Sequence, residues 1–171
     1  MTFLELAKKR FSVRKFTDQP VEKEKLDKVL EAGNIAPTAK NLQPQRIYVL
    51  QSEEALKKAY ALTPCCYGAK TVLLFTYDID EEWTNPLEDM IHSGDQDVSI
   101  VATHIMLEAE EQGLATCWVN YFPNTKAAEV FGLPENEVAV LMMPIGYASA
   151  DAVPTANHTA KKPIEKTVRY L

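Results

Sequence analysis

The chain has 171 residues, of which 46% are hydrophobic, and a formal net charge of -6. This length suits one domain of roughly 100–200 residues, so we take residues 1–171 as a single domain. Overall acidity argues against a nucleic-acid-binding protein, and no apolar run reaches the ~20 residues that span a bilayer. The first residues lack the apolar core of a signal peptide. We therefore expect a cytoplasmic protein with no nucleic-acid or membrane partner.

The N-terminal half is predicted to alternate helices and strands. Thr2 can cap a first helix, Gly33 is a natural stop for a second, and Ser52 can cap a third. The expected elements are a helix over 3–9, an extended segment to residue 20, a helix over 22–32, a loop over 35–44, a strand over 47–50, a helix over 53–61 and a strand over 71–77.

The C-terminal half begins with an acidic stretch, 78–94, which is predicted to be a loop whose length indicates function or mobility. The clearest helix follows over 97–112, because its apolar residues form a wide stripe at helical spacing. The remaining expected elements are a strand over 115–121, a helix over 124–131, a strand over 138–147 and an irregular tail. Without a βαβ rhythm, this order predicts the α+β class, with helices flanking a mainly antiparallel sheet.

Positive charge gathers near the two ends of the chain. Nine of the 18 basic residues lie within 8–15 or 161–169. If Arg10-Phe11-Ser12-Val13-Arg14 is extended, Arg10, Ser12 and Arg14 share one face. Two guanidiniums beside a hydroxyl suit an oxyanion such as phosphate, because planar forks bind it bidentately. Chain termini often lie close together, so the two basic clusters can meet at one phosphate.

Motifs of other common sites are missing from the sequence. There is no Gly-x-Gly-x-x-Gly after a strand and no P-loop, which argues against a Rossmann or Walker nucleotide site. Cys65, Cys66 and Cys117 form neither a Cys-x-x-Cys motif nor an even set, so we expect buried, inert thiols. The three histidines lack metal-ligand spacing. We assign no metal and no acid–base role to any of them.

Four segments, in order, cover nearly the whole chain. They are 10–16 (Arg-Phe-Ser-Val-Arg-Lys-Phe), 36–44 (Ala-Pro-Thr-Ala-Lys-Asn-Leu-Gln-Pro), 113–119 (Gly-Leu-Ala-Thr-Cys-Trp-Val), and 143–147 (Met-Pro-Ile-Gly-Tyr) followed by Lys161-Lys162-Pro163-Ile164. Each is weak alone, but together they resemble the motifs of the nitroreductase family of flavin mononucleotide (FMN) enzymes. Segments 62–70 and 120–122 depart from the family pattern, which leaves the substrate unassigned.

The resemblance implies a homodimer with two FMN sites at the subunit interface. One subunit would hold the phosphate and ribityl end, and a loop of the other would reach the flavin ring. The residues implied in cofactor binding are Arg10, Phe11, Ser12, Arg14, Pro37, Thr38, Ala39, Asn41, Gln43, Trp118, Val119, Asn120, Lys161 and Lys162. Asn and Gln amides both donate and accept hydrogen bonds, which suits the mixed edge of an isoalloxazine.

The resemblance also implies a reaction. NADH or NADPH would pass a hydride to flavin N5, and a nitroaromatic, quinone or similar acceptor would then take the electrons by ping-pong kinetics. The flavin carries the chemistry, so no side chain is assigned as catalytic. Three alternatives stay open: another flavin reaction on the same fold, a non-catalytic flavin-storage or sensing protein, and a phosphate-binding module without flavin. The stretch 78–94 is the candidate lid.

Overall fold

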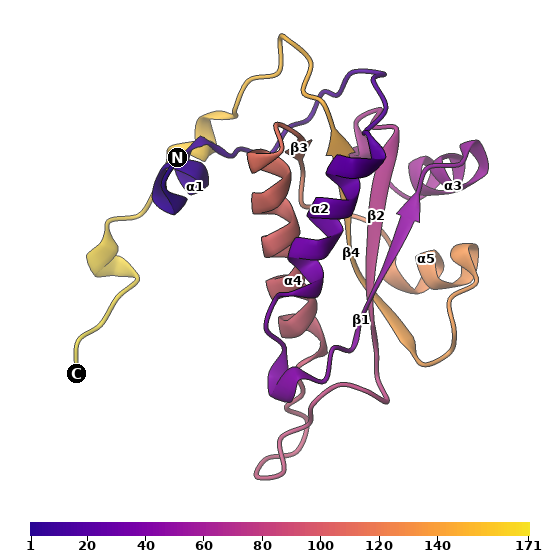
Figure 1. The fold of residues 1–171 in the computed structure, drawn as a ribbon. Coiled ribbons are helices and arrows are strands. Elements are labelled where there is room, and N and C mark those ends of the chain that lie inside the picture. The colour runs from indigo at the N-terminus through magenta and orange to yellow at the C-terminus, as the bar shows by residue number, and fades with distance from the viewer.

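A four-stranded antiparallel sheet with the order β1-β2-β4-β3 forms the centre of the protein, and helices cover both of its faces (Figure 1). The computed structural model describes all residues, Met1–Leu171. The strands are β1 (Gln45–Leu50), β2 (Thr71–Asp78), β3 (Ala115–Thr116) and β4 (Glu137–Gly146). The α-helices are α1 (Phe3–Lys9), α2 (Lys23–Asn34), α3 (Glu53–Leu62), α4 (Gly94–Glu111) and α5 (Asn124–Phe131). The predicted α+β class with an antiparallel sheet is confirmed.

Two apolar cores lie on opposite faces of this sheet. Successive strand residues point to opposite faces, so Leu73 and Phe75 of β2 pack with α2 and α4, while Val72 and Leu74 pack with α3 and α5. All eight residues of β2 are buried. This explains why the strand reads as a nearly continuous apolar run. No helix in the structure is long and apolar enough to cross a membrane.

Local signals placed two helix starts well. Thr2 forms a capping box with Glu5 at α1, and the Ser52 hydroxyl accepts the Ala55 N–H at α3. The predicted stop at Gly33 is wrong, because α2 continues to Asn34. Gly33 lies where α2 meets α4, and a Cβ there would come within 2.7 Å of the Ile105 side chain. The glycine therefore permits close helix packing rather than ending the helix.

The predicted strand over 115–121 is regular only at Ala115–Thr116. Further along, Cys117 donates its N–H to the Pro144 carbonyl, and Val119 exchanges two backbone hydrogen bonds with Met142. Proline has no N–H to return to Cys117, so the ladder is interrupted at that pair. The segment stays beside β4 but does not form a continuous strand.

The acidic segment 79–93 forms an irregular excursion between β2 and α4, at the lower end of the molecule in Figure 1. It contains no helix or strand. Its only β-type backbone pairing is an isolated bridge between Thr84 and His92. Helix α4 begins at Gly94, a turn earlier than the apolar stripe predicted. The first turn consists of polar residues, so the spacing of apolar residues could not predict it.

The segment that follows α1 and the segment that follows β4 both pass over the opposite end of the molecule, at the top of Figure 1. Phe16 bridges Ala148, and the Thr17 N–H donates to the Tyr147 carbonyl. Helix α1 has no buried residue. The C-terminal segment after Ala148 extends away from the sheet with most of its residues exposed. The contacts join residues 15–17 to residues 147–149, and the basic residues of 161–169 lie farther along the exposed C-terminal segment.

Candidate cofactor site

The Arg10–Phe16 segment lies against β3. The Val13 N–H donates to the Thr116 carbonyl at 3.0 Å, and Ser12 forms a bridge with Thr116. Val13 is buried and Arg14 is exposed, as expected for the alternation of an extended chain. Edge pairing therefore holds this segment in the conformation that the sequence predicts.

Arg10, Ser12 and Arg14 all influence the Cys117 thiol. Burial raises the pKa of Cys117, while the positive charge of Arg14, a hydrogen bond with the Ser12 hydroxyl and the charge of Arg10 act in the opposite direction. All three side chains therefore lie close enough to Cys117 to influence its pKa. That they form one phosphate-binding face stays a prediction.

The two arginines have no carboxylate partner. Arg46, in contrast, lies 2.8 Å from Glu81 and 3.4 Å from Asp78. Arg14 donates only to the Ser12 carbonyl, at 3.2 Å, and the adjacent Thr116 hydroxyl is buried without a hydrogen-bond partner. Free guanidinium donors in a protein with an excess of acidic residues fit a phosphate, which accepts bidentate hydrogen bonds.

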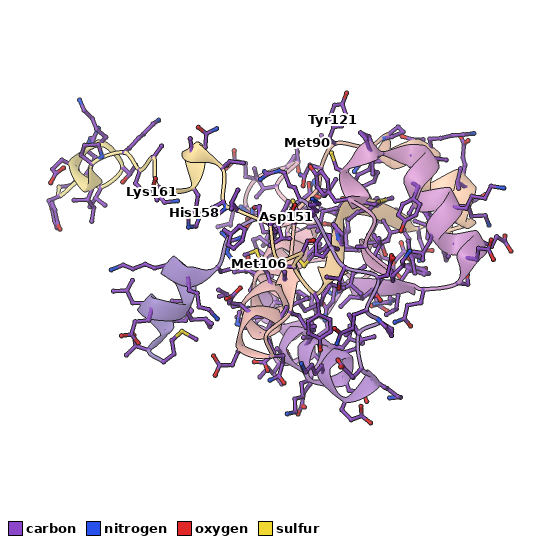
Figure 2. The ribbon with its side chains drawn as sticks, turned by 90° about the horizontal axis from the view of Figure 1, so that it is seen from above. Met90, Met106, Tyr121, Asp151, His158 and Lys161 are labelled. Carbon is purple, nitrogen blue, oxygen red and sulfur yellow. The ribbon has the colours of Figure 1, made fainter.

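Lys161 and Lys162 lie on the C-terminal segment that follows the same edge. Lys15 pairs with Asp151, and the Phe11 ring meets the His158 ring edge-on at 6.1 Å. Asp151 and His158 are labelled in Figure 2. His158 precedes Lys161 by three residues, and Lys161 lies beyond it on the exposed C-terminal segment. That Lys161 and Lys162 share one phosphate with Arg10 and Arg14 stays a prediction.

The loop 37–43 is held in an unusual backbone conformation. Lys40, Asn41 and Gln43 have φ angles of 50°, 56° and 56°, in the left-handed region that residues other than glycine adopt at a cost. The Thr38 hydroxyl accepts the Gln43 N–H at 3.0 Å, and the Ala39 N–H donates to an Asp97 carboxylate oxygen at 2.8 Å. The Asn41 side chain is exposed. Such strain is typical of functional loops.

These two parts of the site lie at opposite ends of α4. Lys9 pairs with Glu110 near the C-terminal end of the helix, and Ala39 bonds to Asp97 in its first turn. At 1.5 Å per residue, the two points are about 20 Å apart along the helix. The structure therefore does not bring the arginine segment and the loop 37–43 together within one chain.

The segment 118–120 lies beside β4. Trp118 is half-buried against the core formed with α2 and α4, and its indole N–H donates to the Asn120 side-chain oxygen at 2.5 Å. Val119 is buried, and its backbone groups are both bonded to Met142. Only the backbone N–H groups of Trp118 and Asn120 lack a partner here. Any backbone donor that this segment offers to a ligand comes from those two residues.

Sequence reasoning missed Tyr67. Burial raises the pKa of its phenol, a hydrogen bond with Cys65 acts in the same direction, and Arg14 opposes them. Arg14 is therefore close enough to Tyr67 to influence its pKa. Its backbone has a left-handed φ of 51°, followed by Gly68 at 77°. The Tyr-Gly pair is a turn signal, but nothing in the sequence links this turn to Arg14.

The histidines take part in local contacts. His92 lies 2.8 Å from Glu82, and His104 lies 2.9 Å from the carbonyl of Ile100 in its own helix. No group of three or more His, Cys, Asp or Glu side chains is placed to hold a metal ion.

The three cysteines are free, and Cys66 and Cys117 are buried. Burial raises the pKa of Cys66 to about 11 and raises that of Cys117. Both thiols are then protonated near neutral pH, and the thiolate is the reactive form. We expect native protein at pH 7.5 to be alkylated by iodoacetamide at the half-buried Cys65 well before the other two. Peptide mass spectrometry at timed intervals measures this order, and faster labelling of Cys66 than of Cys65 would contradict it.

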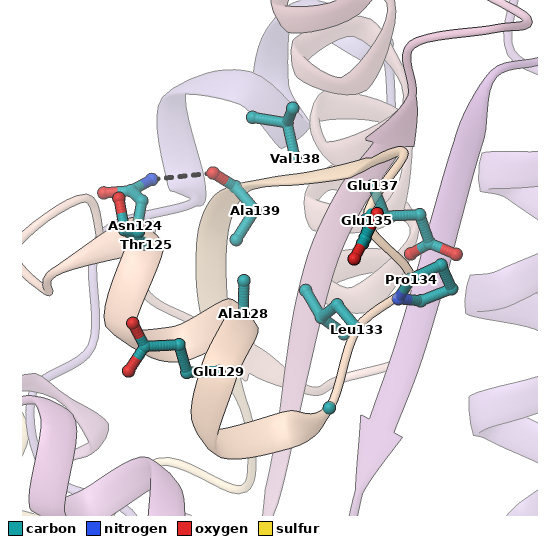
Figure 3. A pocket seen from close by; sticks show the side chains of 11 residues that line it. Asn124, Thr125, Ala128, Glu129, Leu133, Pro134, Glu135, Glu137, Val138 and Ala139 are labelled. Carbon is teal, nitrogen blue, oxygen red and sulfur yellow. Dashed lines mark hydrogen bonds between the residues drawn. The ribbon is translucent and has the colours of Figure 1, made fainter.

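A separate hollow of about 430 Å³ lies between α5 and β4 (Figure 3). Glu129, Glu135 and Glu137 line it, and the Asn124 amide donates to the Ala139 carbonyl at 2.8 Å. Carboxylates repel a phosphate. The hollow contains none of the predicted site residues and does not suit an anionic cofactor.

Comparison with known proteins identifies the fold and the family. The family model described as "Nitroreductase family" matches residues 7–66 and 63–147. A crystal structure of a nitroreductase family protein from Clostridium difficile 630 is 41% identical, with a TM-score of 0.92 over 99% of this chain and 98% of that one. The chain belongs to the nitroreductase family.

Other relatives carry names of oxidoreductases. An FMN-dependent nitroreductase from Clostridium difficile R20291 is 26% identical, with a TM-score of 0.76 and coverage of 98% of both chains. An NADH dehydrogenase from Thermus thermophilus is 25% identical over 96% of this chain and 93% of its own length. The predicted family resemblance is confirmed.

Proposed function

We propose that this protein is a homodimeric, FMN-dependent oxidoreductase that takes electrons from NADH or NADPH and delivers them to a small electron-poor acceptor. The observation that carries the proposal is the pair of half-sites: unpaired arginines at one end of α4 and a strained amide loop at the other. The names of the relatives support the same class of reaction.

Two observations support a second copy. A ligand that meets both half-sites would have to bridge about 20 Å along α4 unless another subunit supplies one of them. Large apolar side chains are also exposed beside and within the loop: Ile35 is 73% exposed and Leu42 44%. Exposed large apolar side chains are available to a protein interface. A dimer would cover these side chains and complete each site.

The residues of this chain would bind and orient the cofactor. Arg10 and Arg14 would donate to the phosphate and Ser12 to the phosphate or ribityl chain, while Lys161 and Lys162 would add positive charge. When bound, FMN would supply the redox chemistry, accepting a hydride at N5 and passing the electrons to a nitroaromatic, quinone or similar acceptor.

The loop 37–43 of the second subunit would meet the ring. Amide side chains can donate and accept, and a loop already strained into shape loses little further entropy on binding. The free N–H groups of Trp118 and Asn120 are further candidate donors to the ring. One open face would serve donor and acceptor in turn, so the kinetics should be ping-pong.

We expect freshly purified protein to show flavin absorption that bleaches when NADH or NADPH is added without oxygen and returns when a quinone is added. Anaerobic absorption spectroscopy, followed by steady-state NAD(P)H oxidation, tests this. Flavin absorption without any turnover would indicate a storage protein instead. Failure to bind added FMN would contradict the proposal.

A further inference from the structure

Asp97 is a buried carboxylate with an unusual set of partners. It is 2% exposed, and it forms no salt bridge. One carboxylate oxygen accepts the Ala39 N–H at 2.8 Å, and the other accepts the Ser93 hydroxyl at 2.7 Å. A buried charge is costly unless hydrogen bonds and dipoles compensate for it. Asp97 obtains both, because it lies in the first turn of α4, near the positive end of the helix dipole.

The bond to Ala39 is the single hydrogen bond between the loop 37–43 and a distant part of the chain. The other bonds of the loop are internal or reach its near neighbour Arg46. None of the seven loop residues is buried, so apolar packing does not fix the loop. Left-handed residues such as Asn41 would relax if nothing held them. Asp97 is therefore the main anchor of this conformation.

The same carboxylate is joined to the acidic excursion. The Ser93 hydroxyl accepts the Trp83 N–H at 3.2 Å, and the Ser93 N–H donates to the Trp83 carbonyl at 2.9 Å. The Gly94 N–H donates to Glu82 at 2.8 Å. These bonds close the base of the excursion, and Ser93 connects that base to Asp97.

We propose that Asp97 is a positioning residue that, with Ser93, fixes the loop 37–43 in the shape that meets the flavin. This inference rests on the proposed function, because it assumes that the loop contacts FMN. The chain of bonds runs from Trp83 through Ser93 and Asp97 to Ala39. It makes the base of the acidic excursion part of the support of the cofactor site.

The test compares Asp97→Asn with Asp95→Asn. Asp95 lies in the same first turn of α4 but is exposed and has no hydrogen-bond partner, so its variant matches the change in charge. Amide hydrogen exchange on the FMN-free protein measures the loop directly. Fluorescence titration with FMN then measures the dissociation constant. We expect Asp97→Asn to speed Ala39 exchange and weaken FMN binding, each by about tenfold or more, because a charge-assisted hydrogen bond is lost.

A milder variant guards against failure to fold. Ser93→Ala removes one of the two bonds to Asp97 and should shift both measurements in the same direction by a smaller factor. Unchanged Ala39 exchange in Asp97→Asn would overturn the proposal. Faster exchange with the FMN affinity of the Asp95→Asn control would also overturn it. If the wild-type protein binds no FMN, the proposed function is contradicted. The Ala39 exchange rates, measured without FMN, still show whether Asp97 holds the loop.

Discussion

Replacing both Arg10 and Arg14 with alanine is expected to weaken FMN binding at least about 100-fold. A hydrogen bond to a charged group contributes about 1.5–3 kcal/mol, and every 1.4 kcal/mol changes a dissociation constant about tenfold. Neither arginine has a carboxylate partner in the structure. The FMN-free variant should therefore melt within about 2 °C of the wild type. Fluorescence titration and thermal unfolding measure the two effects.

The matched control is Lys28→Ala with Lys57→Ala. It also removes two positive charges. Lys28 lies on α2 and Lys57 on α3, and both side chains are exposed and form no salt bridge. If the control weakens FMN binding as much, then overall charge and not the arginine segment governs affinity. If the arginine variant loses stability in parallel with affinity, the two side chains are structural, and their role in binding phosphate is contradicted.

Local patterns predicted most of the fold. The caps at Thr2 and Ser52 and the apolar run of β2 depend on near neighbours in sequence, and all three are confirmed. The misplaced boundaries depend on contacts across the fold. Gly33 alone predicts the end of a helix, but in the structure it allows Ile105 to pack closely against α2. The predicted strand over 115–121 is interrupted because Pro144 of β4 lies opposite Cys117.

The candidate site also combines features that depend on near neighbours in sequence with features that depend on contacts across the fold. Arg10, Ser12 and Arg14 could be predicted to share a face because alternation in an extended segment needs no tertiary information. Asp97 could not be found from sequence, because its bond to Ala39 joins residues 58 apart. Separation of the two half-sites along α4 also required the structure, although the family resemblance implied a loop from the other subunit.

A second large effect is expected from the loop 37–43. The double variant Asn41→Gly/Gln43→Gly removes both amide side chains, and glycine adopts positive φ without strain. Both native residues have a φ of 56°. In an alanine variant, the loss of side-chain contacts could not be separated from the effect of backbone strain. We expect this loop variant to bind FMN at least about tenfold more weakly than the wild type, because contacts with the ring are lost. Unchanged affinity would remove the loop from the site.

Mixing the two defective variants tests directly whether each flavin site is shared between two subunits. A heterodimer of one Arg10→Ala/Arg14→Ala subunit and one Asn41→Gly/Gln43→Gly subunit would place both defects in one site and leave the other site intact, as follows from two-fold symmetry. Two affinity tags allow its purification, and FMN titration measures its affinity. A site shared between two subunits predicts one FMN bound per heterodimer with wild-type affinity. A heterodimer without any tight site would show that both half-sites act within one subunit, and would contradict a shared site.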